Sequence, residues 1–208
     1  MRYGILGGSF NPPHRGHLAL ASTVLELSLA DRVVLIPAAS PPHKAAPREA
    51  DPETRLAMTR LLAGDDRRLD VSDIELRRSG PSFTVDTVRQ LLREHPAVSY
   101  RLVLGSDQAK AFATWREYKA LLELAPPLVA ERPDDLFEAD AGDRYPGLTP
   151  EEAATMERGR FAMTPVDVSS TKVRRLLNEG APEKDILECL TEPVYRFVRE
   201  HGLYAPLG

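Results

Sequence analysis

The sequence is poor in cysteine and in long apolar runs. Cys189 is the only cysteine among 208 residues, which excludes intrachain disulfides and cysteine-based zinc sites. No stretch of about 18 consecutive apolar residues occurs, and the apolar run at the N-terminus is too short for a signal peptide. We therefore expect a cytoplasmic protein with no membrane partner.

An excess of positive charge is also missing. The chain has 27 Lys and Arg against 31 Asp and Glu, a net charge of −4. A general nucleic-acid-binding protein usually carries a basic excess, so we expect no nucleic-acid partner. The negative charge is concentrated in residues 133–157, which hold eight acids and one base and leave the rest of the chain at +3.

The composition is that of a globular chain. Hydrophobic residues make up 42% and charged residues 28%, which is too apolar for a disordered protein. The length suits one domain over residues 1–208 with a sizeable core. It leaves the oligomeric state open, a homo-oligomer included.

Apolar runs and helical periodicities alternate along the chain. The strands we expect are Tyr3–Leu6, Arg32–Pro37, Leu69–Leu76, Tyr100–Leu104, Leu128–Ala130 and Phe161–Val166. The helices we expect are Leu18–Leu29, Pro52–Ala63, Phe83–Glu94, Lys172–Asn178 and Pro182–Leu190, so that residues 171–208 form a small C-terminal helical part.

This alternation predicts an α/β fold with an open, doubly wound, Rossmann-like parallel sheet. In such sheets ligands bind beyond the carboxyl ends of the strands, where Gly7, Pro37 and Gly105 stand. The acidic residues 133–157 are predicted to be a solvated, insert-like loop with a short helix from about Thr149, and a mobile lid is the alternative.

The first segment with chemical content follows the first strand and reads GGSFNPPHRGH, from Gly7 to His17. Glycines after a strand let backbone N–H groups approach an anion, and the start of a helix adds the positive end of its dipole. His14 and His17 are three residues apart, so both imidazoles share a face if the first helical turn begins near His14, and they could then meet phosphate oxygens. Gly16 between them leaves room for a nucleotide.

Metal binding is the alternative for a His-x-x-His pair. Zinc would need a third and usually a fourth ligand, and no Cys, Asp or Glu stands near His14 and His17 in the sequence. That missing ligand set favours phosphate, and we expect no protein metal site.

Gly8–His17 resembles the short signature of the nucleotidyltransferase superfamily, with the spacing of its nicotinate mononucleotide adenylyltransferases. Asn11 departs from the Asp that is common at its position. Four further segments resemble motifs of that family in the same order: the PPHK loop ending at Lys44, the segment from Gly80 to Thr87, Gly105–Asp107 with Trp115, and the SSTxxR motif from Ser169 to Arg174.

The resemblance implies a nucleotidyltransferase that joins ATP to nicotinate mononucleotide in NAD biosynthesis, with Mg²⁺ carried by ATP. It implies the following roles. Catalytic residues would be His14, His17, Lys44 and Arg174; ATP and phosphate would contact Gly7, Gly8, Ser9, Phe10, Gly16, Ser169, Ser170 and Thr171; the pyridine nucleotide would contact Thr84, Asp86, Gly105, Asp107 and Trp115.

Each of these residues also has a structural interpretation. Ser170 and Thr171 could simply cap a helix, and Asp107 could cap another. Thr84 and Asp86 could be the N-terminal cap and the first-turn acid of the Phe83–Glu94 helix. Trp115 could be core packing, and Lys44 and Arg174 could be solvated charges.

Rival functions remain open at this point. The nearest is a sister adenylyltransferase that uses nicotinamide mononucleotide or phosphopantetheine. An aminoacyl-tRNA synthetase would need a further domain, and a nicotinamide dehydrogenase would need a G-x-G-x-x-G loop that this sequence lacks. A nucleotide sensor would bind ATP without releasing pyrophosphate.

Overall fold

The structure is a computed structural model that describes residues 1–39, 50–131, 144–164 and 166–205. Its strands are β1 (Arg2–Gly8), β2 (Arg32–Pro37), β3 (Leu69–Val71), β4 (Ser99–Gly105), β5 (Leu128–Glu131) and β6 (Arg160–Ala162). Its helices are α1 (Arg15–Glu26), α2 (Pro52–Ala63), α3 (Thr84–Glu94), α4 (Ser106–Lys110), the 3-10 turn η1 (Phe112–Thr114), α5 (Tyr118–Leu124), α7 (Pro150–Glu157), α8 (Ser170–Asn178), α9 (Glu183–Cys189) and α10 (Glu192–Glu200).

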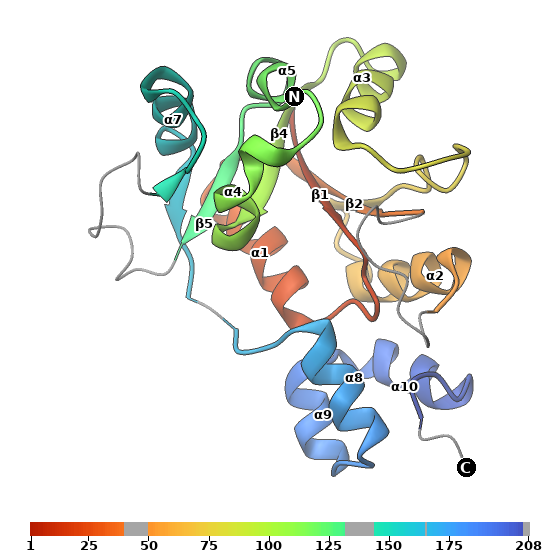
Figure 1. The fold of residues 1–208 in the computed structure, drawn as a ribbon. Coiled ribbons are helices and arrows are strands. Elements are labelled where there is room, and N and C mark those ends of the chain that lie inside the picture. Colours follow the sequence, from red (N-terminus) through yellow and green to blue (C-terminus); the bar gives the residue numbers. More distant parts are fainter. Residues whose placement is uncertain (40–49, 132–143, 165, 206–208) are drawn as a thin grey trace. The chain divides into compact units, whose positions relative to one another are not determined.

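The strands form one six-stranded sheet in the order β3-β2-β1-β4-β5-β6 (Figure 1). The pairs β1–β4, β4–β5 and β5–β6 are parallel. The predicted parallel α/β sheet is therefore confirmed. The strand order reverses next to β1, and ligands of open parallel sheets bind beyond the strand ends near such a point. This directs attention to Gly7 and Gly8 at the end of β1.

The chain divides into two compact units. Unit 1 comprises Met1–Leu6, Leu20–Val34 and Phe83–Pro165, and unit 2 comprises Gly7–Ala19, Leu35–Ser82 and Val166–Gly208. The expectation of one domain over residues 1–208 stays a prediction.

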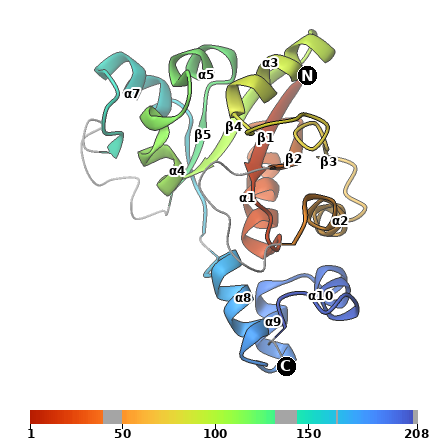
Figure 2. The same ribbon diagram turned by 45° about the vertical axis from the view of Figure 1, so that its right-hand side comes forward.

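Unit 1 holds β4, β5 and β6 together with α3, α5 and α7. Its core strands are nearly continuous runs of buried apolar residues, as expected where helices cover a parallel sheet. Helix α5 packs against both α3 and α7 (Figure 2). Helix α7 begins with a capping box in which Thr149 and Glu152 exchange hydrogen bonds, so the predicted helix start near Thr149 is confirmed. The rest of the predicted acidic loop, residues 133–143, lies outside the described residues.

Unit 2 holds β3, α2 and the three C-terminal helices. Helix α9 packs against α8 and α10, and α10 also packs against α2. The predicted C-terminal helices are confirmed as α8 and α9, and α10 is an additional helix that we did not expect. Its apolar residues Val194, Tyr195 and Val198 are buried on one face.

Several other boundaries differ from the prediction. The expected strand Phe161–Val166 is β6 and ends at Ala162. The expected strand Leu69–Leu76 ends at Val71, because the Ser72 hydroxyl accepts a hydrogen bond from the Ile74 N–H and turns the chain. Helix α1 begins at Arg15 rather than Leu18, since its first turn is polar and carries no apolar periodicity. This earlier start puts His17 inside the first helical turn.

Candidate active site

The segment from Gly8 to His17 lies within unit 2 and connects β1 to α1. The carbonyl of Gly8 accepts a hydrogen bond from the Ala38 N–H at 2.9 Å. His14 directly precedes α1, and its carbonyl accepts from the N–H groups of His17 and Leu18 at 3.0 and 3.4 Å. Both imidazoles are therefore held at the N-terminal end of a twelve-residue helix.

The two imidazoles stack on each other with ring centroids 3.7 Å apart. The backbone N–H of His14 donates to Nδ1 of His17 at 3.2 Å, so that nitrogen carries no proton. The neutral His17 ring must then carry its proton on Nε2. The ring of Phe10 lies 4.7 Å from the His17 ring and fixes its other side. The geometry makes Nε2–H of His17 a hydrogen-bond donor of fixed orientation.

Burial keeps both imidazoles neutral at pH 7. Loss of solvation lowers the pKa of His14 from 6.5 to about 4. Burial also lowers the pKa of His17 well below 6.5, and the neighbouring His14 lowers it further. Nδ1 of His14 is buried and has no hydrogen-bond partner among the described residues. A buried polar atom without a partner indicates a position that a ligand or water completes.

Gly16 also has a structural role that the sequence analysis did not predict. A Cβ at this position would lie 3.0 Å from Cγ1 of Val168 and 3.1 Å from the His14 ring. The missing side chain therefore makes room for the imidazole and for the chain before α8. Gly7, in contrast, has nothing within 4 Å of a Cβ position and is exposed.

The SSTxxR segment forms the start of α8 and also belongs to unit 2. Ser169 caps the helix by accepting from the Lys172 N–H at 3.1 Å. The Ser170 hydroxyl donates to the carbonyl of Pro12 at 2.9 Å. The structure thus joins two segments about 158 residues apart in the chain.

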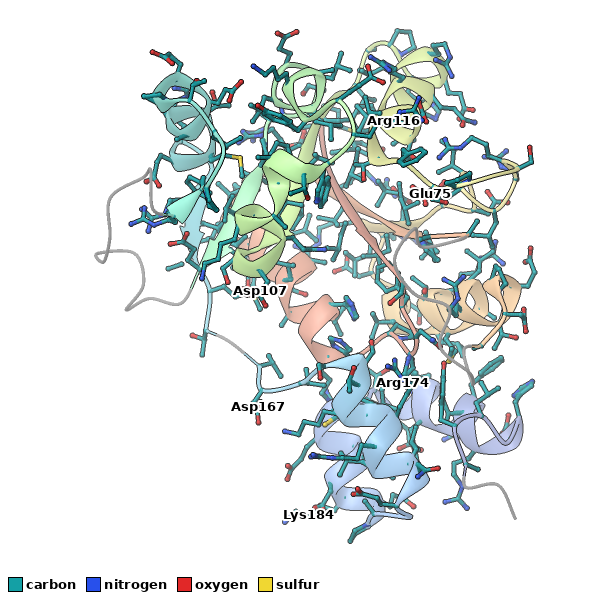
Figure 3. The ribbon with its side chains drawn as sticks, in the orientation of Figure 1. Glu75, Asp107, Arg116, Asp167, Arg174 and Lys184 are labelled. Carbon is teal, nitrogen blue, oxygen red and sulfur yellow. The ribbon has the colours of Figure 1, made fainter. Side chains whose placement is uncertain are left out.

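Arg174 extends this contact from the next turn of α8 (Figure 3). Its Nη1 donates to the carbonyl of Asn11 at 2.6 Å, and its Nη2 donates to the Thr171 hydroxyl at 3.3 Å. A guanidinium has five N–H donors, so further donors remain for an anion. Ser169, Ser170, Thr171 and Arg174 therefore gather at the loop that leads to His14.

Asn11 accepts hydrogen bonds from distant parts of the chain, which the sequence did not reveal. Its side chain is 1% exposed, and Oδ1 accepts hydrogen bonds from the Ala50 N–H at 3.2 Å and from the Tyr204 hydroxyl at 2.6 Å. Its Nδ2 is buried without a partner among the described residues. The only signal in the sequence was the departure from Asp at this position, and nothing pointed to Tyr204.

The residues expected to contact the pyridine nucleotide lie in unit 1. Two of them, Thr84 and Asp86, are at the start of α3, which contacts Arg116. Thr84 and Asp86 are in the first turn of α3, and Phe83, whose side chain makes no capping bond, precedes them. The Arg116 guanidinium lies over the Phe83 ring at 4.6 Å, and its Nη1 is 3.9 Å from Oδ2 of Asp86 (Figure 3). Thr84 is the first residue of α3 and not its capping residue, so that interpretation is wrong, whereas Asp86 lies in the first helical turn as the structural interpretation predicted.

The other expected pyridine contacts follow β4 and η1, also in unit 1. The Gly105 N–H donates to Oε1 of Gln108 at 3.1 Å, and Asp107 is exposed in the first turn of α4. Trp115 is half-buried, with its ring centroid 5.4 Å from that of Phe112. Part of the indole thus remains available to stack on a planar ligand.

The structure does not describe every residue that the sequence analysis assigned to the site. Lys44 lies outside the described residues, and so does the whole PPHK loop. Within the part of the chain that the structure describes, no group of three or more His, Cys, Asp or Glu side chains could hold a metal ion, and no helix is long and apolar enough to cross a membrane.

Comparison with known proteins identifies the chain. The family model described as cytidylyltransferase-like matches residues 5–176. A protein of Geobacter metallireducens named "Probable nicotinate-nucleotide adenylyltransferase" is 36% identical over 98% of both chains, and one of the same name from Geobacter sulfurreducens is 37% identical over 100% of both. The chain belongs to the nicotinate-nucleotide adenylyltransferase family.

Solved structures agree with this adenylyltransferase fold. The Plasmodium falciparum nicotinic acid mononucleotide adenylyltransferase complexed with NaAD matches with a TM-score of 0.75 and 18% sequence identity. The match covers 98% of this chain and 97% of that one. The fold of this nicotinate-nucleotide adenylyltransferase is thus shared across most of the chain even where the sequences have diverged.

Proposed function

We propose that this enzyme transfers the adenylyl group of ATP to the 5′-phosphate of nicotinate mononucleotide. The products are nicotinate adenine dinucleotide and pyrophosphate, and the reaction belongs to NAD biosynthesis. The observation that carries the proposal is the stacked pair His14 and His17 at the start of α1. Both imidazoles are neutral, and hydrogen bonds to Asn11 and Pro12 connect their loop to the SSTxxR helix. That arrangement occurs in a chain of the nicotinate-nucleotide adenylyltransferase family.

The reaction requires little proton transfer. The attacking phosphate and the leaving pyrophosphate are both ionised at pH 7, so no general base has to be charged or discharged. A neutral imidazole is suited to this task because it donates a hydrogen bond without the desolvation cost of a buried cation. Catalysis then consists of alignment and of stabilising the charge that grows on the α-phosphate and pyrophosphate.

The residues of unit 2 supply the phosphate donors in this proposal. Nε2–H of His17 donates to an α-phosphate oxygen, and His14 uses its unpartnered Nδ1 nearby. Arg174 keeps free N–H groups beside its bond to Asn11 and supplies positive charge. Lys44 adds a second cation from the PPHK loop. Backbone and side-chain contacts to ATP come from Gly7, Gly8, Ser9, Phe10, Gly16, Ser169, Ser170 and Thr171.

The acceptor nucleotide is assigned to residues of unit 1. The exposed part of Trp115 suits a flat pyridine ring, and backbone N–H groups near Thr84 suit its carboxylate. Gly105 and Asp107, where β4 meets α4, suit the ribose. Asp86, which lies close to Arg116, completes this set.

Mg²⁺ enters with ATP in this proposal. The donors around His14 and Arg174 are N–H groups, which suit an anion and not a cation, so phosphate oxygens and water would hold the ion. Bound there, Mg²⁺ would neutralise charge on the triphosphate. We further propose one domain over residues 1–208, supported by relatives that match 98 to 100% of the chain, and a cytoplasmic location.

A pyrophosphate-release assay tests the acceptor. The purified enzyme with Mg-ATP is offered nicotinate mononucleotide, nicotinamide mononucleotide and phosphopantetheine in separate reactions. We expect release with nicotinate mononucleotide and a much lower kcat/KM with the other two. Pyrophosphate release with phosphopantetheine alone, or with none of the three, would overturn the proposal.

A further inference from the structure

Arg55 connects three segments of unit 2 through a single buried guanidinium. It lies on α2 and is 3% exposed. Its Nη1 donates to the carbonyl of Ser9 at 2.7 Å, its Nε to the carbonyl of Ala50 at 3.1 Å and its Nη2 to the carbonyl of Ala39 at 3.3 Å. Every nitrogen of the side chain therefore donates to a backbone carbonyl from a different segment.

The shortest of these bonds acts on the peptide that enters Phe10. The carbonyl of Ser9 belongs to the peptide group directly before Phe10, whose φ is +47°. A non-glycine residue in the left-handed region is strained and persists only when its surroundings hold it. Phe10 is fully buried, and its ring lies 4.7 Å from that of His17. The hydrogen bond from Arg55 thus holds the Ser9–Phe10 peptide in the orientation that places the Phe10 ring against the His17 imidazole.

The two longer bonds hold residues that are tied to the same loop by other contacts. The N–H of Ala50 donates to Oδ1 of Asn11, while its carbonyl accepts from Arg55. Ala39 follows Ala38, whose N–H donates to the carbonyl of Gly8. In the sequence, Ala39 and Ala50 stand on either side of the segment that carries the PPHK motif.

We propose that Arg55 is a positioning residue for the ATP site, which fixes the Ser9–Phe10 peptide and thereby the orientation of His17. It acts through Ser9 and Phe10 and makes no contact of its own with the reacting phosphorus. This inference rests on the proposed function. Lysine cannot replace it, because an ammonium donates from one nitrogen atom, whereas the carbonyls of Ser9, Ala39 and Ala50 accept from three separate nitrogens of the guanidinium.

Steady-state kinetics with three variants test this role. Arg55→Lys keeps the charge, Leu62→Ala removes core contacts from the same helix, and Arg60→Ala changes an exposed arginine of that helix. We expect Arg55→Lys to lower kcat roughly 10²-fold, the size seen when a reacting group is misplaced by about 1 Å. Leu62→Ala and Arg60→Ala should keep kcat within about twofold at a temperature where all variants are folded.

The comparison with Leu62→Ala separates positioning from stability. If Arg55→Lys loses no more kcat than Leu62→Ala at an equal fall in Tm, the residue is only structural and the proposal is overturned. A change in the KM for nicotinate mononucleotide alone, with kcat unchanged, would overturn the proposal as well.

A measurement on the unaltered enzyme covers the case in which Arg55→Lys does not fold. Hydrogen exchange of the Arg55 Nε–H is followed by NMR, first alone, then with a non-hydrolysable ATP analogue, then with nicotinate mononucleotide. We expect the ATP analogue to slow this exchange at least about tenfold and nicotinate mononucleotide alone to leave it unchanged. An unchanged rate with the analogue bound overturns the inference. This readout needs no turnover, so it stays distinct from a failure of the proposed acceptor.

Discussion

The Tyr204 hydroxyl donates a hydrogen bond to Oδ1 of Asn11 at 2.6 Å, across 193 residues of sequence. Both side chains are buried. The backbone carbonyl of Asn11 also accepts a hydrogen bond from Arg174. Tyr204, which follows the last helix, is thereby held against the loop that leads to His14 and His17. The position of Asn11 therefore depends on Tyr204 and Ala50, two residues outside the motifs that the sequence analysis singled out.

Tyr204→Phe should lower the stability of the protein without preventing folding. The substitution removes one donor to Asn11 and leaves the Ala50 N–H in place, so we expect a loss of about 1 kcal/mol. In a chain of this size that corresponds to a fall in Tm of about 2–4 °C.

Asn11 itself provides the matched pair for that experiment. Asn11→Asp keeps an acceptor for both donors and should stay active, whereas Asn11→Leu removes the oxygen that accepts from the Tyr204 hydroxyl and the Ala50 N–H. We expect Asn11→Leu to lower the free energy of unfolding by about 1–3 kcal/mol, measured by urea unfolding. Equal stability of the Leu and Asp variants would show that these two bonds do not hold the loop.

His17→Ala should lower kcat by roughly 10²–10³-fold, the usual effect of removing one donor to the transition state. The fold should remain intact, because His17 is only half-buried and α1 has Ala21, Val24 and Leu25 in the core. His201→Ala, at the end of α10, is the control and should leave kcat unchanged. Near-normal turnover of His17→Ala would remove this imidazole from the mechanism.

The pKa of His14 should be about 4 in the free enzyme, since burial favours its neutral form. The unfolded chain has a pKa near 6.5 at this residue, so between pH 4 and 6.5 it binds more protons than the folded chain does. The free energy of unfolding therefore rises with pH in this window. As the pH falls from about 6.5 to about 4, the free energy of unfolding decreases. His14 should account for about 3 kcal/mol of that loss.

NMR titration of the imidazole signals measures this directly. A titration midpoint for His14 near 6.5 would mean that the ring is solvated and would contradict the description of a buried neutral donor.

Gly16→Ala should damage activity more than stability. The added methyl group meets Cγ1 of Val168 and the His14 ring at 3.0–3.1 Å, so the imidazole has to shift by a few tenths of an ångström. We expect kcat to fall about tenfold or more, because donors to a transition state act over a narrow range of positions. Unchanged kcat together with an unchanged His14 NMR signal would show that the contact is loose.

The sequence predicted the sheet well because parallel strands buried on both faces are continuous apolar runs. Arg32–Pro37 appears in the structure with the predicted bounds. Helix α10 was missed although Pro193 near its start and the spacing of Val194 and Val198 are signals for it. The strand after Leu69 was predicted too long, since a local bond from Ile74 to the Ser72 hydroxyl competes with strand pairing.

The candidate site was predictable only in part. The motifs singled out His14, His17 and Arg174, but no local pattern could reveal that Arg174 donates to Asn11, 163 residues earlier. Arg55 shares a helix face with the buried Leu62, and a charged residue on an apolar face is a signal that sequence reasoning could have used. The roles assigned to the site residues stay predictions.

The destination of the adenylyl group shows whether the enzyme transfers it to nicotinate mononucleotide. ATP labelled at its α-phosphate is incubated with the enzyme, Mg²⁺ and nicotinate mononucleotide, and the products are separated. The account predicts that the label appears in nicotinate adenine dinucleotide in an amount equal to the unlabelled pyrophosphate released. Label that stays in ATP, or that is found on the protein instead of in the dinucleotide, would contradict it.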